Sequence, residues 1–188
     1  MKMKKALLRS AIIVAIILLS VGVGFICQMI GHRVDLKKYP REFSSFVEKY
    51  SRESGVPEEV AYGVIKYVSG FSSNHVGEDG GIGLMGITPA VFEKLLAETK
   101  EDLTDGILYD PETNIRYGMR YLNDLFISYG RWEQVYAAVV AGEETVNGWR
   151  ADPSLLGDKG QLTIPDKSVA AKVKDVSKIV EKYKDLYY

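Results

Sequence analysis

The sequence contains little of what covalent and metal chemistry usually needs. It has one cysteine, Cys27, and two histidines, His32 and His75, among 188 residues. A lone cysteine forms no intrachain disulfide, and a remainder free of cysteine is compatible with an oxidising exterior. No second His, Cys or acid lies at metal-binding spacing from His75, so the sequence predicts no metal site and no cofactor.

The chain also has almost no net charge, but its charges are unevenly distributed. The formal net charge is −1, although residues 1–33 hold five basic residues and no acidic one. The remainder holds 19 basic and 25 acidic residues. A phosphate-binding surface needs clustered positive charge, so the acidic balance argues against nucleic acid as a partner.

Internal repeats, low-complexity tracts and strands of alternating polarity are absent from the sequence. Apolar residues instead recur at helical spacing, which predicts an all-α fold with one compact domain and an appendage. Glycines at 55, 70 and 130 are the expected helix ends. The helical patterns cover residues 43–54, 57–68, 89–98, 111–129, 132–141 and the segment from 164 onward.

The amino-terminal residues predict a membrane attachment. Residues 1–10 are basic, and residues 11–30 are twenty mostly apolar residues, about the length that a helix needs to cross the hydrocarbon core. We expect a cytoplasmic N-terminus, an uncleaved transmembrane signal anchor at 11–30, a linker at 31–41 and a folded domain at 42–188. A signal peptide cleaved after the small residues 22–24 is the alternative.

The stretch 65–89, IKYVSGFSSNHVGEDGGIGLMGITP, is where we expect the functional site. An apolar helix ends at Gly70, a loop with five glycines follows, and Thr88 offers an N-cap oxygen before Pro89 at the first helical position. Such a loop can bring backbone close to a ligand.

The order of motifs here resembles the lytic transglycosylases of the soluble (SLT, goose-lysozyme-like) family, which cleave the glycan strands of peptidoglycan. The resemblance is carried by Ser-Gly-Phe at 69–71, Gly-Gly-Ile-Gly-Leu-Met at 80–85 and Asp-Pro-x-x-Asn-Ile at 110–115. It spans about residues 39–187. It implies a lysozyme-like helical domain on the extracytoplasmic side of the cell membrane, with peptidoglycan glycan strands or envelope proteins as partners.

The chain departs from the family pattern at the positions that carry chemistry. Val68 stands where the resemblance implies a catalytic glutamate, Gly86 where it implies a glutamine, and Val139-Val140 where it implies Tyr-Asn. Cleaving a glycosidic bond needs an acid to protonate the leaving oxygen, and a valine has no proton to donate. We therefore interpret the chain as a catalytically inactive homologue. The residues that the resemblance places in substrate binding are Ser69, Phe71, Met85, Gly86, Val139 and Val140.

An active enzyme with a relocated acid is the alternative hypothesis. Glu78, beside Asp79 in the glycine-rich loop, and Glu143, beside Glu144 after the 132–141 helix, are the candidate acids. Either would have to come within about 3 Å of the glycosidic oxygen. Such loop acids are more often solvated turn residues.

Two binding roles remain open for an inactive homologue. Glycan binding predicts that Phe71, Met85 and Tyr136 contribute to an open cleft. Docking of an envelope protein predicts that Val68 and the valines at 139–140 fill the cleft or form a large apolar patch.

Overall fold

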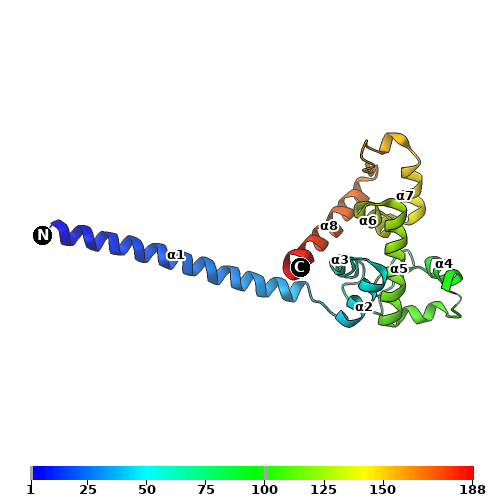
Figure 1. Cartoon of the computed structure of the whole chain (residues 1–188), viewed down its shortest axis with the longest axis horizontal. Coiled ribbons are helices and arrows are strands. Elements are labelled where there is room, and N and C mark those ends of the chain that lie inside the picture. The colour runs from blue at the N-terminus through cyan, green and yellow to red at the C-terminus, as the bar shows by residue number, and fades with distance from the viewer. Residues whose placement is uncertain (1, 100) are drawn as a thin grey trace. The chain divides into compact units, whose positions relative to one another are not determined.

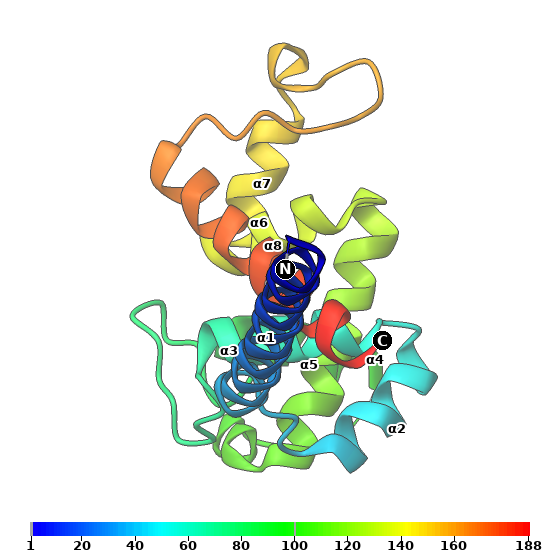
Figure 2. The same cartoon turned by 90° about the vertical axis from the view of Figure 1, so that its left-hand side faces the viewer.

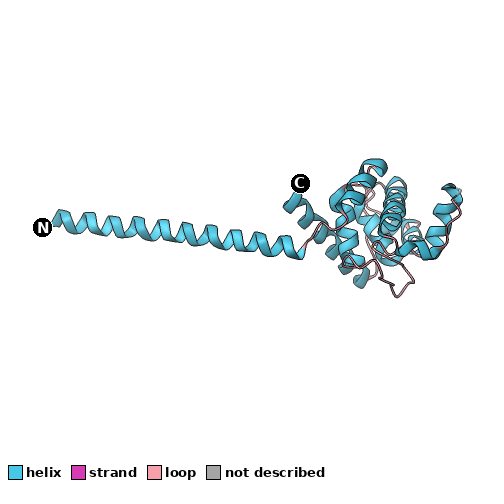
Figure 3. Cartoon of the chain, turned by 90° about the horizontal axis from the view of Figure 1, so that it is seen from below, coloured by secondary structure: helices cyan, strands magenta, loops and turns pink. Residues whose placement is uncertain are grey.

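The computed structural model describes residues 2–99 and 101–188, with side chains from residue 19 onward. The chain divides into two compact units, Met1–Pro40 and Arg41–Tyr188. The described residues form helices and loops without strands, as the all-α prediction required (Figure 3). The helices are α1 (Lys2–Lys38), α2 (Ser44–Ser54), α3 (Glu58–Val68), α4 (Pro89–Thr99), α5 (Pro111–Tyr129), α6 (Trp132–Ala141), α7 (Glu143–Arg150) and α8 (Lys167–Tyr187), with short 3₁₀ helices η1 (Asp105–Tyr109) and η2 (Pro153–Leu155).

The first unit is the long helix α1, and it continues through most of the segment 31–41 that we expect to be a linker. Among the described residues, no helix meets the length and hydropathy needed to span a bilayer. The side chains of residues 11–18, which belong to the expected span 11–30, lie outside the described part of the chain.

Local sequence signals set most helix ends in the second unit. Gly55 and Gly130 follow α2 and α5 with φ of 76° and 70°, a conformation that glycine adopts without strain. The Asp110 side chain accepts a hydrogen bond from the Thr113 N–H at 2.8 Å and caps α5. Thr88 caps α4 through its hydroxyl, which accepts from the Val91 N–H at 3.3 Å. These predictions are confirmed.

The start of the last helix was predicted wrongly. The Ile164-Pro165 pair precedes the helix, and α8 begins at Lys167. Asp166 is the reason, because its side chain accepts from the backbone N–H groups of Ser168 and Val169. The aspartate is a better N-cap than the isoleucine before the proline.

Aromatic ring contacts join helices in the core of the second unit. Helix α8 packs against α3 and α6, and the rings of Tyr62 and Tyr183 stack there at 5.4 Å between centroids. The Phe92 and Tyr117 rings meet edge to face at 4.8 Å, which joins α4 to α5. The loop between α7 and α8, which holds η2, extends away from this core (Figures 1 and 2).

A buried amide on α5 holds the glycine-rich loop in place. Asn114 is fully buried, and its Oδ1 accepts from the Met85 N–H at 2.8 Å. Its Nδ2 donates to the carbonyls of Ile82 at 2.9 Å and Leu108 at 2.8 Å. Gly83 passes directly over this amide, because a Cβ at that position would lie 2.3 Å from Nδ2. One side chain thus connects α5, η1 and the loop.

We expect Asn114→Ala to destabilise the chain by about 3 kcal/mol, because the substitution leaves the Met85 N–H and the Leu108 carbonyl without partners and removes one of two bonds to the Ile82 carbonyl. Asn123→Ala on the same helix is the matched control, and it should change the free energy of unfolding by less than about 0.5 kcal/mol. Urea unfolding followed by circular dichroism measures both. Equal effects of the two substitutions would contradict the anchoring role of Asn114.

Candidate functional site

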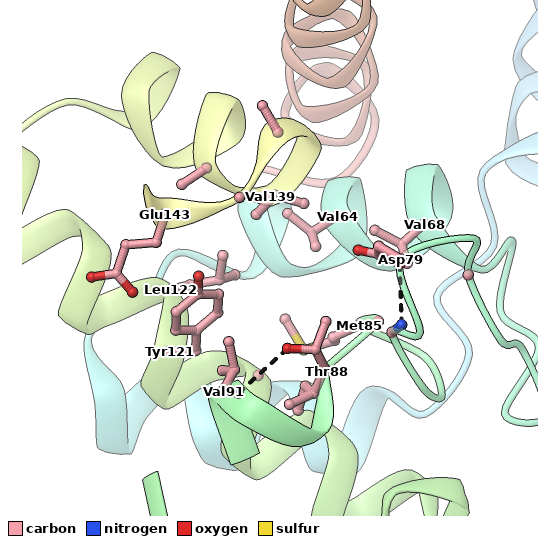
Figure 4. Close-up of a pocket in the computed structure, with 18 of the residues that line it drawn as sticks. Val64, Val68, Asp79, Met85, Thr88, Val91, Tyr121, Leu122, Val139 and Glu143 are labelled. Carbon is pink, nitrogen blue, oxygen red and sulfur yellow. Dashed lines mark hydrogen bonds between the residues drawn. The ribbon is translucent and has the colours of Figure 1, made fainter. Parts of the chain in front are cut away.

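A cleft of about 420 Å³ opens beside the glycine-rich loop. Its walls come from the end of α3, the loop, the start of α4, the middle of α5 and the junction of α6 with α7 (Figure 4). This volume lies within the range of small-molecule binding sites. The cleft is therefore the candidate functional site of the second unit.

Val68 occupies one corner of the cleft together with the loop glycines. It is the last residue of α3 and is half-buried. A Cβ built on Gly86 would lie 2.6 Å from Val68 Cγ1, so the valine fills the space that a side chain at 86 would enter. Gly86 also has φ of 64°, which disfavours any residue with a Cβ. Residues 68 and 86 are therefore coupled by direct packing.

Asp79 is the carboxylate in the same corner (Figure 4). Its Oδ1 accepts a hydrogen bond from the Gly81 N–H at 3.1 Å. Gly81 in turn lies against Gly86, since a Cβ on Gly81 would lie 2.5 Å from the Gly86 carbonyl oxygen. The aspartate side chain is thus folded onto its own loop.

Glu143 and Tyr121 mark the opposite end of the cleft (Figure 4). The Lys94 Nζ atom lies 3.2 Å from a Glu143 carboxylate oxygen and forms an ion pair with it. Burial raises the pKa of the Tyr121 phenol above its usual range, and the Glu143 charge raises it further. The phenol is therefore a neutral hydrogen-bonding group at any physiological pH.

The floor between these ends is apolar. Met85 is almost fully buried and packs on Gly118 of α5, where a Cβ would lie 2.4 Å from the methionine sulfur. Val64, Leu122 and Val139 complete the surface. The result is an apolar floor with polar groups at its two ends.

The structure brings three of the six predicted binding residues to the cleft, namely Met85, Gly86 and Val139. It places the others elsewhere, each for a local reason. The Ser69 hydroxyl is occupied by the carbonyls of Leu84 and Ile65, at 2.8 and 3.1 Å. Phe71, with φ of 72°, is buried near the Tyr62 ring. Val140 follows Val139 on α6 without lining the cleft.

Of the two acids proposed as relocated donors, only Glu143 lines the cleft. Glu78 and its neighbour Asp79 are both exposed, and only Asp79 lines the cleft. Glu144 and His75 also contribute to the walls. Within the described residues, no cluster of three or more His, Cys, Asp or Glu residues is arranged to hold a metal ion.

Sequence reasoning missed the contribution of α5 and α4. Tyr121, Thr88 and Val91 line the cleft although none was proposed as a binding residue. A signal existed, because Gly118 and Tyr121 are three residues apart on one helix face, and a glycine within a helix often marks a close approach of another segment.

Comparison with known proteins places the chain in a family. The model of the transglycosylase SLT domain matches residues 45–160. The chain therefore belongs to the SLT transglycosylase domain family, as the motifs predicted. The domain fold is lysozyme-like and all-helical.

Solved structures show the same fold. The lytic transglycosylase Slt of Pseudomonas aeruginosa, crystallised as an inactive mutant, has 22% identity and a TM-score of 0.67 over 79% of this chain. The 70-kDa soluble lytic transglycosylase of Escherichia coli has 22% identity and a TM-score of 0.70 over 80% of it, and its complex with bulgecin A gives 0.71. The chain spans about a quarter of the length of each of these proteins.

The coupling of residues 68 and 86 gives a direct prediction. Gly86→Ala should destabilise the chain by about 2 kcal/mol or more, because it adds a clash with Val68 to the cost of an alanine at positive φ. Gly80→Ala is the control, since Gly80 has φ of 81° with nothing near its Cβ. It should cost only the backbone strain, about 1 kcal/mol.

A double-mutant cycle isolates the contact. Val68→Ala combined with Gly86→Ala should be less destabilising than the sum of the single changes, because the shorter side chain removes the clash. Thermal or urea unfolding measures the four free energies. Additive effects would show that the two residues do not pack together.

Proposed function

We propose that the second unit is a peptidoglycan-binding SLT domain that does not cleave the glycan. Membership of the family indicates a peptidoglycan-related role. The observation that carries the non-catalytic part is the apolar corner at the end of α3. There, Val68 packs against Gly86 where the family pattern has an acid and an amide.

The chemistry of glycan cleavage explains why this corner matters. Protonation of the leaving oxygen by a general acid typically contributes a factor of about 10² to 10⁴ in rate. The end of a helix in a partly buried site raises a carboxyl pKa and keeps a donor protonated near neutrality. Val68 has this location, but its side chain has no acidic proton to donate.

Three carboxylates that could in principle replace the lost acid line the cleft, Asp79, Glu143 and Glu144, and the first two already have partners. Asp79 accepts the Gly81 N–H, and Glu143 forms an ion pair with Lys94. Asp79 is the stronger candidate because it shares the corner with Val68 and Gly86. An active enzyme that uses Asp79 is the second candidate function.

Of the residues that glycan binding predicts for the cleft, Met85 lines it, whereas Phe71 and Tyr136 do not. A glycan suits the cleft better than a protein as its occupant, because the cleft is open and its valines form no large apolar patch. Val68 and Val139 are half-buried in its wall, and neither is among the strongly exposed apolar residues of the unit, such as Val76 and Ile127. A docking surface for a protein would expose these valines as a patch. A narrow cleft with Tyr121 and carboxylates at its ends suits a sugar chain with hydroxyl donors.

Digestion of purified peptidoglycan by the full-length chain tests the hypothesis that the domain does not cleave the glycan. We expect no 1,6-anhydro muropeptides by mass spectrometry under conditions in which an active lytic transglycosylase releases them. If the chain does release them, the Asp79→Asn and Glu143→Gln variants identify the acid, and the non-catalytic proposal fails.

Binding to sacculi tests the cleft as the glycan site. Val139→Trp should weaken co-sedimentation with sacculi by about tenfold, because the indole fills the cleft. Val140→Trp is the matched control, since its neighbouring position is also half-buried but lies outside the cleft. It should bind as the wild type does. Circular dichroism confirms that both variants fold, and equal binding by both would refute the cleft as the site.

We also propose that residues 11–30 attach the chain to the cell membrane with the SLT domain on the outer side. The support for the attachment is the twenty-residue apolar segment. The outer placement rests on the peptidoglycan-related role of the family, because basic residues follow the segment as closely as they precede it. Deletion of residues 2–33 should move the protein from the membrane fraction to the soluble fraction. A wild-type chain that carries a processed N-terminus after residue 24 would instead show a cleaved signal peptide.

A further inference from the structure

A second cavity, of about 280 Å³, lies where α3, α6 and α8 meet, and it shares no lining residue with the cleft. Its polar lining includes Glu59 of α3, Glu133 and Tyr136 of α6, and Glu181 of α8. These residues come from three separate helices. The cavity is thus a feature of the tertiary structure rather than of one helix.

Tyr136 is the buried polar group of this cavity. Its side chain is only 4% exposed, and its hydroxyl has no hydrogen-bond partner in the described part of the chain. The ring is buried, whereas the hydroxyl itself is not fully enclosed by protein. Burial raises the pKa of the Tyr136 phenol, and so do the charges of Glu133, Glu181 and Glu59. Three carboxylates therefore line the same cavity as this phenol, with Glu133 and Glu181 exposed and Glu59 half-buried.

The helix dipoles account for the position of only two of these three carboxylates. Glu59 and Glu133 lie in the first turns of α3 and α6, where a negative charge is favourable. Glu181 lies in the second half of α8 and gains nothing from its dipole. None of the three forms an ion pair with another described residue. Lys184 is the single cation in the described lining, so negative charge is in excess.

An aromatic surface accompanies the carboxylates. Trp132 is half-exposed at the cavity and stacks with Phe126 at 4.4 Å and with Tyr136 at 6.3 Å between ring centroids. An indole face attracts cations through its quadrupole. Carboxylates, a phenol oxygen and an indole together suit an ammonium group, which supplies N–H donors and positive charge. An anion would be repelled.

We propose that this cavity binds a primary ammonium group on an alkyl chain, such as the free side-chain amine of a diamino acid in a peptidoglycan stem peptide. The choice of the stem peptide as the source rests on the proposed peptidoglycan-binding function. The ammonium chemistry rests on the cavity alone.

A fluorine NMR titration of the full-length chain tests the ammonium site. The chain has two tryptophans, so labelling with 5-fluorotryptophan gives one signal for Trp132 and one for Trp149, which lies outside the cavity. Nα-acetyl-lysine methylamide should shift the Trp132 signal saturably at millimolar concentration and leave the Trp149 signal in place. The Nε-acetylated analogue, which has no charge, should shift neither.

Two variants separate recognition from structure. Glu133→Gln combined with Glu181→Gln should weaken the lysine probe about tenfold. Tyr136→Phe should weaken it about threefold without lowering the melting temperature, because the hydroxyl has no partner within the protein. Equal shifts by the charged and neutral probes, or unchanged affinity in the double variant, would overturn the proposal.

Sacculi whose peptide amines have been acetylated test the source of the amine. Wild-type chain should bind them about threefold more weakly than untreated sacculi, and the Glu133→Gln and Glu181→Gln double variant should not distinguish the two. Equal wild-type binding to both kinds of sacculi would overturn the stem-peptide assignment. Absence of all sacculus binding would instead refute the proposed function, and the lysine titration would still decide the ammonium site.

Discussion

The three hydrogen bonds of the Asn114 side chain are the constraint on which the site depends. They tie α5 to the glycine-rich loop at Met85 and Ile82 and to η1 at Leu108. The loop has backbone hydrogen bonds of its own, among them the pair exchanged by Ile82 and Ile87, and the Asn114 side chain adds the bonds that tie it to α5. Because the amide fixes the loop, Met85 reaches Gly118 and Gly86 reaches Val68. The shape of the cleft follows from these contacts.

The chain retains the frame of an SLT domain while its candidate site has a different chemical character. A glutamate at position 68 would need partners in a partly buried corner, whereas a valine is buried there at little cost. Val68 occupies the space that a side chain at position 86 would need, and Gly86 has no side chain to compete for it. This packing stabilises the end of α3 without a charged group.

Much of the fold could be predicted from the sequence, because local signals determine it. Helical spacing, Asp110 and Thr88 as caps, and glycines at 55 and 130 gave helices with nearly the observed bounds. There were three exceptions. Asp166 rather than Ile164 is the N-cap of α8, α7 was not predicted, and α1 continues through most of the expected linker. Most of the candidate site could not be predicted from the sequence. Ser69 and Phe71 lie within three residues of Val68, yet their side chains turn into the protein instead of the cleft.

The sequence by itself determined the family, the all-α class and the presence of a valine at the position of the expected acid. These are properties of residue order and of short-range helix formation. Only the tertiary structure decided that Asp79 rather than Glu78 enters the cleft and that Tyr121 closes its far end. It also decided that Glu59, Glu133 and Glu181 line one cavity with Tyr136. The physical reason is that these groups come from segments far apart in the chain, and the packing of α3, α5, α6 and α8 sets their distances.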